Sequence, residues 1–405
     1  MTDTAQPAPA ATPWRLVLML GALTAFAPMS IDMYLSSMPD IGRTLHAGAE
    51  DVQATLAAFF AGMAIGQFLY GPASDQFGRR LPLLLGVGIF IAASVVCALA
   101  PSVQVLIAAR FVQALGGCAG PVIARAVVRD KFNHADTARV LSMMTLIMGL
   151  APVLAPQLGG AVQFLAGWRG VFWTLAVFGL LIGLWVTLSL AESRSEATAV
   201  QARSENPFRA YFALLRQKRL VGYGLAGALN GATLFTYIST APDLVMGTYG
   251  HPPLVFNIIF AFNAVGIIGA SQVNRLLLRR FTPDQVLVRA SIASIVAALL
   301  LAVAAYSGLG GQFTVLPLLF AALSSYGLMA GNTMAGALSV DPSRAGSTSA
   351  LMGGVSFAAG ALASGVSGVL HDGTPRPVAA VMFACLAGSS LAIFLLAVPK
   401  DRRAA

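Results

Sequence analysis

Charged residues are scarce in this chain. Only 10% of its 405 residues are Asp, Glu, Lys or Arg, whereas soluble domains carry roughly 25%. Apolar residues make up 57% of the sequence, and the mean hydropathy is +0.77. A soluble protein of this length needs a charged surface, so the composition excludes a cytosolic or secreted enzyme. It indicates instead a protein that crosses a membrane several times.

Residues that build disulfides, metal sites and nucleotide sites are also few. The three cysteines, Cys97, Cys118 and Cys385, fall in apolar runs, so the sequence predicts no disulfide framework. The four histidines fall in loops between such runs, which argues against an intramembrane histidine relay or a metal site. The sequence contains no GxxxxGK[ST] segment, so nothing suggests that ATP drives this chain. We expect no cofactor and no enzyme activity.

Long apolar runs dominate what is present, and Leu81–Ala100 and Thr174–Leu190 are examples. Each is close to the roughly 20 residues that a helix needs to cross a bilayer. Strands of a membrane barrel would alternate apolar and polar residues over about ten positions. The sequence therefore predicts an all-α membrane protein with twelve transmembrane helices. They cover residues 16–38, 52–71, 81–100, 103–128, 139–162, 170–190, 220–241, 254–274, 285–306, 313–339, 346–370 and 377–398.

Basic residues are distributed unevenly along this predicted topology. With the N-terminus on the cytoplasmic side, only Arg43, Arg169 and Arg376 fall in outer loops, and Arg110 lies within a span. All the others lie in inner loops, in the tails or at inner helix ends, which is the positive-inside pattern. The net charge of +9 therefore predicts insertion with both termini cytoplasmic, and attraction to anionic lipid. It does not indicate nucleic-acid binding.

One long polar segment divides the predicted spans into two sets of six. We predict an N-terminal six-helix bundle over residues 1–190, a cytoplasmic linker over 191–219 and a C-terminal six-helix bundle over 220–405. The basic pair Arg79-Arg80 after span two recurs as Arg279-Arg280 after span eight, a weak sign of duplication. Transporters built from two such repeats bind their substrate between the repeats, near the middle of the membrane.

Four segments carry a resemblance to a known family. They read IDMYL at 31–35, GPASDQFGRR at 71–80, RFVQALGG at 110–117 and GLAPVLAPQLGG at 149–160. The last three resemble the GxxxDxxGRR loop, the RxxQG helix and the glycine/proline antiporter helix of the major facilitator superfamily. The first resembles the DMYLP segment of its bicyclomycin/chloramphenicol resistance branch, with Ser36 in place of the proline. The resemblance implies the major facilitator fold and a proton-coupled multidrug antiporter.

The loop after span two is expected to act as a gate. Gly71 and Gly78 permit a tight turn, and Arg79 and Arg80 hold the loop on the cytoplasmic side. Asp75 is expected to point at the start of span eleven, near residues 343–347, where free amides and the helix dipole favour an anion. The resemblance implies that such a latch stabilises the outward-facing state.

Span five contains prolines and glycines at positions that bend a helix and admit a close neighbour. These residues are Gly149, Pro152, Pro156, Gly159 and Gly160, and Ala155 stands where the family commonly has glycine. The resemblance implies that this kinked helix seals the interface between the halves and favours antiport. Ordinary packing of small residues is the alternative.

Asp32 is the only acidic residue well inside a predicted span, and a carboxylate at membrane depth is costly enough to be a functional candidate. At 1.5 Å per residue, Asp32 and Arg110 both lie about 9–10 Å below the outer boundary. We therefore hypothesise that they form a direct or water-bridged pair that protonation or substrate loosens. Gln113 lies one turn below Arg110 and is expected to share the network. In similar transporters the fourth-helix arginine is implicated in proton coupling. The alternatives are an Asp32 at the outer mouth and a structural Arg110.

A cavity for varied substrates needs adaptable apolar walls and few polar anchors. Spans one and five offer methionines and a tyrosine, and spans seven and eight offer polar groups. The candidates for the walls are Met29, Met33, Tyr34, Met144 and Met148, and those for the anchors are Asn230, Tyr237 and Asn263.

Together these features predict a secondary transporter of the bacterial inner membrane. We expect a monomer that exports small drug-like molecules by proton antiport, through alternating access of its two halves. The alternative is a proton-coupled transporter of a natural metabolite such as a nucleoside, amino acid or sugar. A receptor or enzyme on the same scaffold is a further alternative. The sequence shows no appended soluble domain and no metal-ligand pattern that would favour it.

Overall fold

The computed structural model describes residues 14–132, 134–196, 200 and 207–398, and within them it contains helices and no strand. The first half comprises α1 (Trp14–Thr24), α2 (Phe26–Leu35), α3 (Met38–Leu45), α4 (Ala49–Phe77), α5 (Arg80–Ala98), α6 (Val103–Gly117), α7 (Ala119–Lys131) and α8 (His134–Ser189). After it come α10 (Pro207–Leu215), α11 (Lys218–Pro242), η1 (Asp243–Thr248), α12 (Pro253–Leu277), α13 (Pro283–Ser307), α14 (Gln312–Val340), η2 (Pro342–Arg344), α15 (Ala345–Val369), α16 (Arg376–Ala392) and η3 (Ile393–Ala397).

The predicted membrane fold is confirmed. Among the described residues, nine helical segments are long and apolar enough to cross a membrane, and the bent pair α1–α2 makes a tenth. One of the nine, the stretch 146–189 of α8, contains two helices joined at Gly167, where φ is +68°. The remaining span is α11, which is long enough but less apolar. The twelve spans thus fall into two sets of six.

Two of the predicted spans are interrupted, and prolines explain both breaks. α1 and α2 meet at an angle of 47°, and Pro28 cannot donate to the carbonyl of Thr24, where α1 ends. Pro121 likewise cannot donate to the carbonyl of Gly117, where α6 ends. Span one is thus the bent pair α1–α2, which ends at Leu35, earlier than predicted, and span four is the pair α6–α7.

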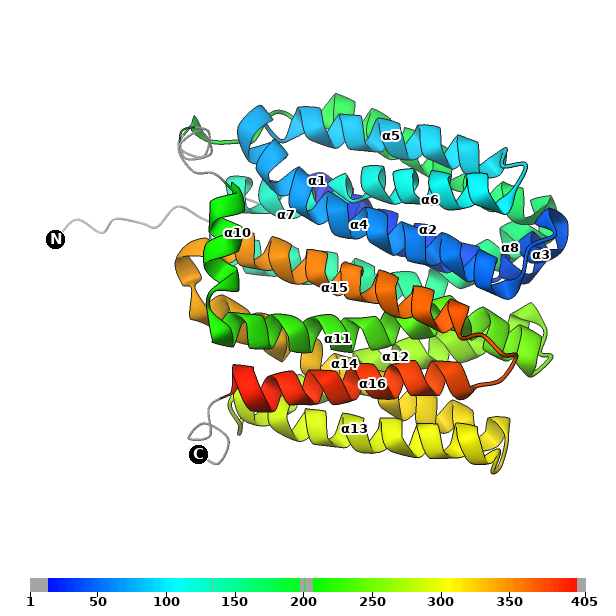
Figure 1. Cartoon of the computed structure of the whole chain (residues 1–405). Helices are drawn as coiled ribbons and strands as arrows, with labels where there is room; N and C mark the ends of the chain where they lie inside the picture. The colour runs from blue at the N-terminus through cyan, green and yellow to red at the C-terminus, as the bar shows by residue number, and fades with distance from the viewer. Residues whose placement is uncertain (1–13, 133, 197–199, 201–206, 399–405) are drawn as a thin grey trace.

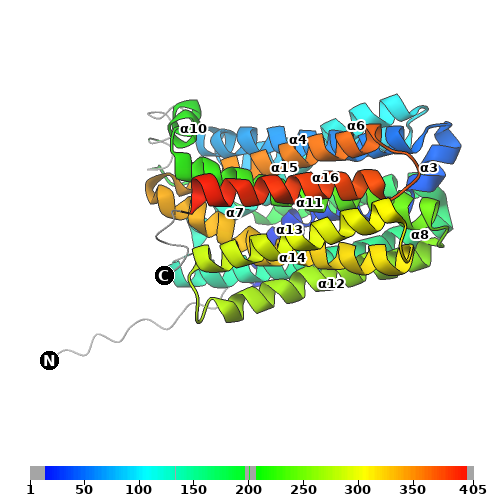
Figure 2. The same cartoon turned by 60° about the horizontal axis from the view of Figure 1, so that its bottom comes forward.

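The two sets of helices lie side by side along one direction (Figure 1). α10 lies across one end of this bundle, and the described chain begins and ends at the same end (Figures 1 and 2). We call it the linker end. α3 lies at the opposite end, the far end, where it contacts η1. The segment predicted as a plain linker thus contains a short helix, α10.

Small residues let helices pack closely within each half, and large apolar side chains cover the outside. A Cβ added to Gly116 of α6 would lie 2.6 Å from the carbonyl oxygen of Gly86 in α5, so only glycine fits there. Leu180, Leu184 and Leu299 are more than one-third exposed on outer faces of the bundle. Such an apolar surface matches lipid tails and would be a liability in water.

Candidate functional site

Asp32 lies in α2, three residues before the end of that helix, and is 3% exposed. Within the described part of the chain, its carboxylate forms no hydrogen bond or ion pair. Tyr237 of α11, in the other half, lies within electrostatic range of the carboxylate. The phenol oxygen of Tyr237 accepts a hydrogen bond of 2.7 Å from Nδ2 of Asn263. Asp32 therefore faces a neutral hydrogen-bonded pair across the junction of the halves.

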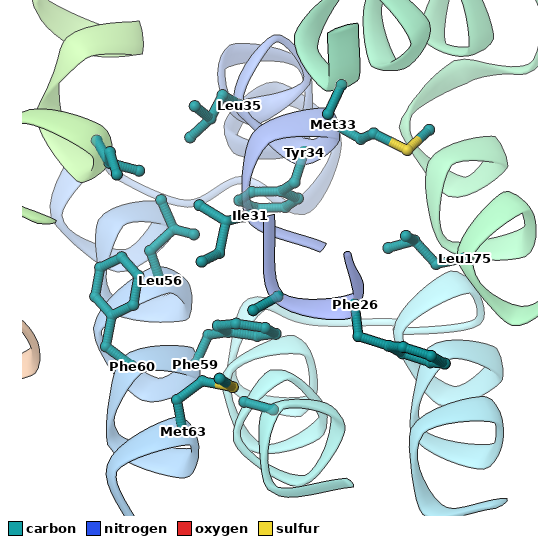
Figure 3. Packing of buried hydrophobic residues seen from close by; sticks show 14 of the residues in the cluster. Phe26, Ile31, Met33, Tyr34, Leu35, Leu56, Phe59, Phe60, Met63 and Leu175 are labelled. Carbon is teal, nitrogen blue, oxygen red and sulfur yellow. The ribbon is translucent and has the colours of Figure 1, made fainter. Parts of the chain in front are cut away.

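Arg110 is completely buried inside the first half. Its Nη1 donates to Oε1 of Gln113 at 2.7 Å, and Nε2 of Gln113 donates to Oγ of Ser94 at 2.8 Å. Nε and Nη2 of Arg110 have no hydrogen-bond partner among the described residues. The guanidinium carbon lies 4.3 Å from the ring centre of Phe59 and 4.8 Å from that of Tyr34, so the aromatic faces stabilise the cation. Figure 3 shows these two rings, with that of Tyr34 from α2 above that of Phe59 from α4.

The predicted direct pair of Asp32 and Arg110 is absent from this conformation. Tyr34 occupies the face of α2 that meets Arg110, and its hydroxyl bonds to Oγ1 of Thr55 at 2.7 Å. Residues two positions apart on a helix point about 200° apart. Asp32 therefore points away from Arg110 and toward α11. The pairing of the two residues was predicted from their equal depth in the membrane. Depth alone does not fix the direction in which a side chain points around the helix axis.

A hydrogen-bonded junction joins the two halves at the far end. Ser36, just after α2, donates to Oδ1 of Asn257 in α12 at 2.8 Å. Nδ2 of Asn257 donates to the carbonyl oxygen of Pro156 in α8 at 3.2 Å. Asn257 is only 4% exposed, so its amide joins two first-half helices to the second half in a site shielded from solvent. Ser36 is the residue that departs from the proline of the DMYLP pattern.

The glycine/proline motif of α8 lies against the same junction. A Cβ on Gly159 would meet the carbonyl oxygen of Met33 at 2.1 Å, so α8 touches the backbone of α2. A Cβ on Gly160 would lie 2.9 Å from Nδ2 of Asn257. Gly149 is looser, since its nearest neighbour is Ile268 at 3.9 Å. Pro152 is half-buried, and Pro156 is buried.

The residues predicted for a substrate cavity do not converge on one space in this conformation. Met33, Tyr34 and Met144 are buried in the first half, Met29 is half-buried and Met148 is 45% exposed. In the second half, Asn230 is buried, and neither of its side-chain polar atoms has a partner within the described chain. Of the polar candidates, only Tyr237 and Asn263 are joined by a hydrogen bond.

An aromatic cluster that the sequence did not reveal crosses the junction instead. The ring of Phe60 in α4 lies 4.6 Å from that of Phe235 in α11. Phe235 in turn stacks on Phe357 of α15 at 5.0 Å. Phe60 itself is fully buried (Figure 3).

Arg79 organises the linker end of the first half. Its Nε donates to Oδ2 of Asp130 in α7 at 2.7 Å, and its Nη1 bonds to Asp75 and to Oγ of Ser74. The side chain of Arg79 is 3% exposed. Desolvation lowers the pKa of Arg79, but the hydrogen bonds and charges of Asp130 and Asp75 outweigh it and raise the pKa above the usual value. The cation is therefore locked between two carboxylates.

Glu192 secures the start of the linker against the same loop. Its carboxylate accepts hydrogen bonds from the backbone N–H groups of Arg79, Arg80, Ser193 and Arg194. Desolvation raises the pKa of Glu192, but these four donors outweigh it and hold the pKa below its usual value. A Cβ on Gly78, where φ is +92°, would lie 2.5 Å from Oε2 of Glu192, so this turn requires glycine.

One expectation for the gating loop is wrong, and the latch at Asp75 stays a prediction for the outward-facing state. α4 continues through Gly71 to Phe77, so the chain turns only at Gly78. Among the described residues, the Asp75 carboxylate does not bond to the start of α15, because Arg79 holds it. Arg194 donates to the carbonyl oxygens of Asp75 and Gln76. Arg80 donates to the carbonyl oxygen of Thr187 at 2.7 Å.

Comparison with known proteins gives matches over nearly the whole chain. The sequence profile of the Major Facilitator Superfamily matches residues 20–364. The "Uncharacterized MFS-type transporter YdgK" of Bacillus subtilis is 34% identical over 387 residues, which cover 94% of each chain. The "Bicyclomycin resistance protein homolog" of Haemophilus influenzae is 31% identical over 380 residues, 94% of this chain and 95% of that protein.

The solved structures support the fold. That of a D-xylose-proton symporter matches with a TM-score of 0.72 at 13% identity, covering 96% of this chain and 98% of that one. At this identity the likeness concerns the arrangement of helices alone.

Proposed function

Since the chain belongs to the major facilitator superfamily, we propose that it exports small drug-like molecules across the bacterial inner membrane in exchange for protons. The relatives support the drug-efflux branch of the superfamily. The observation that carries the proton part of the proposal is Asp32. It is a carboxylate buried within a span, unpaired among the described residues and turned toward the other half.

We propose that the linker end faces the cytoplasm. α10 and the adjoining residues carry Arg209, Arg216, Lys218 and Arg219, and the loop after α4 carries Arg79 and Arg80. This excess of basic residues at one end of the bundle is the positive-inside signal. The far end, with α3 and η1, is then the outer side.

The contacts between the halves support alternating access. The outer junction of Ser36, Asn257 and Pro156 is formed in this conformation, so the two halves are joined on the outer side. Opening that side separates α2 from α11 and changes the water contact of Asp32. A carboxyl group whose solvation changes in this way binds a proton in one state and releases it in the other. Protonation is thus tied to which side is open.

The test is drug-driven proton movement in proteoliposomes that carry a pH gradient. A chloramphenicol-type compound should release protons through the native protein, and Asp32→Asn should abolish the coupled signal while leaving the protein folded and inserted. Glu50→Gln, at the solvent-exposed start of α4, serves as the matched carboxylate control and should behave as native. Full proton-driven export by Asp32→Asn would overturn the role of this residue.

A neutral polar metabolite is the second candidate substrate. Asn230 has both side-chain polar atoms without partners among the described residues, and Tyr237 and Asn263 add uncharged hydrogen-bonding groups. Such groups suit the hydroxyls and amides of a nucleoside or sugar. An unbiased substrate screen decides between the two candidates, because a drug exporter should accept several unrelated apolar compounds.

A further inference from the structure

A small polar pocket lies at the outer end between the halves. It is lined by Gln53 of α4, by Thr240 and Asp243 of the α11–η1 segment, and by Ser367 and His371 on the second-half side. Its volume of about 10 Å³ is roughly that of one water-sized sphere. Nδ1 of His371 lies 3.4 Å from Oδ2 of Asp243. The mechanism described so far uses none of these residues.

Two buried polar atoms of the lining lack partners. Oε1 of Gln53 and Oγ of Ser367 have no hydrogen-bond partner among the described residues, although Gln53 is 1% exposed and Ser367 is 2% exposed. Buried polar groups of this kind are normally satisfied, by protein or by water. The pocket is therefore suited to a water molecule that joins the first half to the Asp243–His371 pair. About one-quarter of each side chain of that pair remains exposed, so protons from outer water can reach it.

One face of α11 connects this pocket to Asp32. Asp243, Thr240 and Tyr237 follow one another at three-residue intervals, and residues so spaced are neighbours on the helix surface, so each of the three lies beside the next. Tyr237 is the residue that lies within electrostatic range of the Asp32 carboxylate. Six residues of helix correspond to about 9 Å along the axis. A series of hydroxyl and carboxyl groups thus runs inward from the pocket to Asp32.

Several charged groups belong to the elements around the Asp243–His371 pair. Asp372 follows His371 in the loop before α16, and Arg376 is the first residue of that helix. Asp40 and Arg43 pair with each other on α3, and Glu50 lies in the first turn of α4. Hydrogen bonding to Thr374 holds the pKa of Asp372 below its usual value. Burial raises the pKa of Asp243, which lies beyond the end of α11, and the nearby His371 partly opposes this. Asp243 thus binds a proton more readily than a surface aspartate does.

We propose that Asp243 and His371 form an outer proton-uptake site that supplies Asp32 along this face of α11. The proposal rests on the proposed proton antiport. One proton from outer water binds the pair. Water and the hydroxyls of Thr240 and Tyr237 then each accept one proton as they give up another, and the last proton binds the carboxylate of Asp32. The net change is the movement of one proton, and no other group is altered.

The test uses proteoliposomes containing the full-length protein, with drug loaded on one side and the outer pH varied at constant inner pH. His371→Gln and Asp243→Asn should each slow net drug–proton exchange about tenfold and shift or flatten its dependence on outer pH. Exchange of labelled for unlabelled drug, which needs no net proton movement, should continue in both variants and report that they are folded. Asp372→Asn, one residue from His371, should keep the native profile.

The outcomes separate this inference from the proposed function. If the native protein shows no drug-driven proton movement, the proposed antiport itself is wrong. If the native protein couples drug to protons and both variants keep its outer-pH profile, antiport stands and the uptake site is wrong. If either variant loses both labelled-drug exchange and net transport, the pair has a structural role. That result would also overturn the uptake site.

Discussion

The two ends of the bundle are held together by different chemistry. At the far end, neutral hydrogen bonds through Asn257 join the two halves to each other. At the linker end, the ion pairs of Arg79 tie together parts of the first half, and Glu192 ties the linker to it. A neutral hydrogen bond contributes about 1 kcal/mol, whereas breaking a buried ion pair by removing one partner costs about 3–5 kcal/mol. From this difference we expect the far end to open and the loop at the linker end to stay rigid.

Removal of Arg79 should have the largest effect. Arg79→Ala leaves Asp130 and Asp75 without their shared cation, and the Asp130 side chain is only 10% exposed. We expect a loss of about 3 kcal/mol in the free energy of unfolding, because a buried carboxylate is left uncompensated. Thermal unfolding in detergent measures it. Arg80→Ala, which loses a bond to a backbone carbonyl, is the control and should be less destabilised. Equal stability of the two variants would refute the rigid-loop interpretation.

A side chain at Gly159 should have the next largest effect, this time on transport. Gly159→Val places carbon atoms where the backbone of Met33 lies, so α8 must move away from α2. Overpacking of this kind costs about 1–3 kcal/mol, and the junction through Asn257 is displaced with it. We expect drug transport to fall about tenfold or more. Gly149→Ala, whose nearest neighbour is at 3.9 Å, should transport normally; an equal loss there would show that any substitution in the motif is harmful.

Ser36→Ala sharpens the comparison at the far end. The substitution leaves Oδ1 of Asn257 without its donor and should favour the outward-open state by about 1 kcal/mol. Spin labels at Arg43→Cys on α3 and Thr248→Cys on η1, in a background without native cysteines, report the separation of the halves. A larger population at long distance is expected. An unchanged distance distribution would mean that the hydrogen bond does not control opening.

Glu192→Gln should have the smallest effect, and one that depends on pH. The folded protein holds the pKa of Glu192 below its unfolded value, so the stabilisation is present at neutral pH and is lost as the pH falls. Because the carboxylate is exposed, we expect less than about 1 kcal/mol. The melting temperatures of native and variant protein should differ at pH 7 and converge below about pH 4. Glu196→Gln, in the exposed part of the linker, should match the native protein at both values.

The sequence predicted well how deep a residue lies in the membrane, and it predicted poorly in which direction its side chain points around the helix axis. Twelve spans, two halves and the placement of Asp32 inside a span follow from apolar runs, which depend on composition. The contact between Tyr34 and Arg110 depends on rotation about a helix axis, and the break after α1 changes that rotation. The breaks at Pro28 and Pro121 were visible in principle, since a proline removes a bond to the residue four positions earlier.

Contacts between distant segments could not be found from one sequence. Ser36 and Asn257 are separated by 221 positions, and no local pattern marks Asn257 as a partner. Glu192 looks like an ordinary linker acid until the turn at Gly78 brings four N–H groups to it. The gating loop was identified from its sequence motif. The residues that bond to it belong to α7 and to the linker, which the motif does not indicate.

The turn at Gly167 has a practical consequence for mapping the topology of this protein. A single residue separates the two helices of α8, and its neighbours Phe164 and Leu165 are 89% and 81% exposed apolar side chains. Nothing long enough to be cut by a protease or recognised by an antibody projects there. A reporter tag inserted at this point would split a helical hairpin and not lengthen a loop. Failure of the tagged protein to accumulate would then report a disrupted fold and not the side of the membrane on which the tag lies.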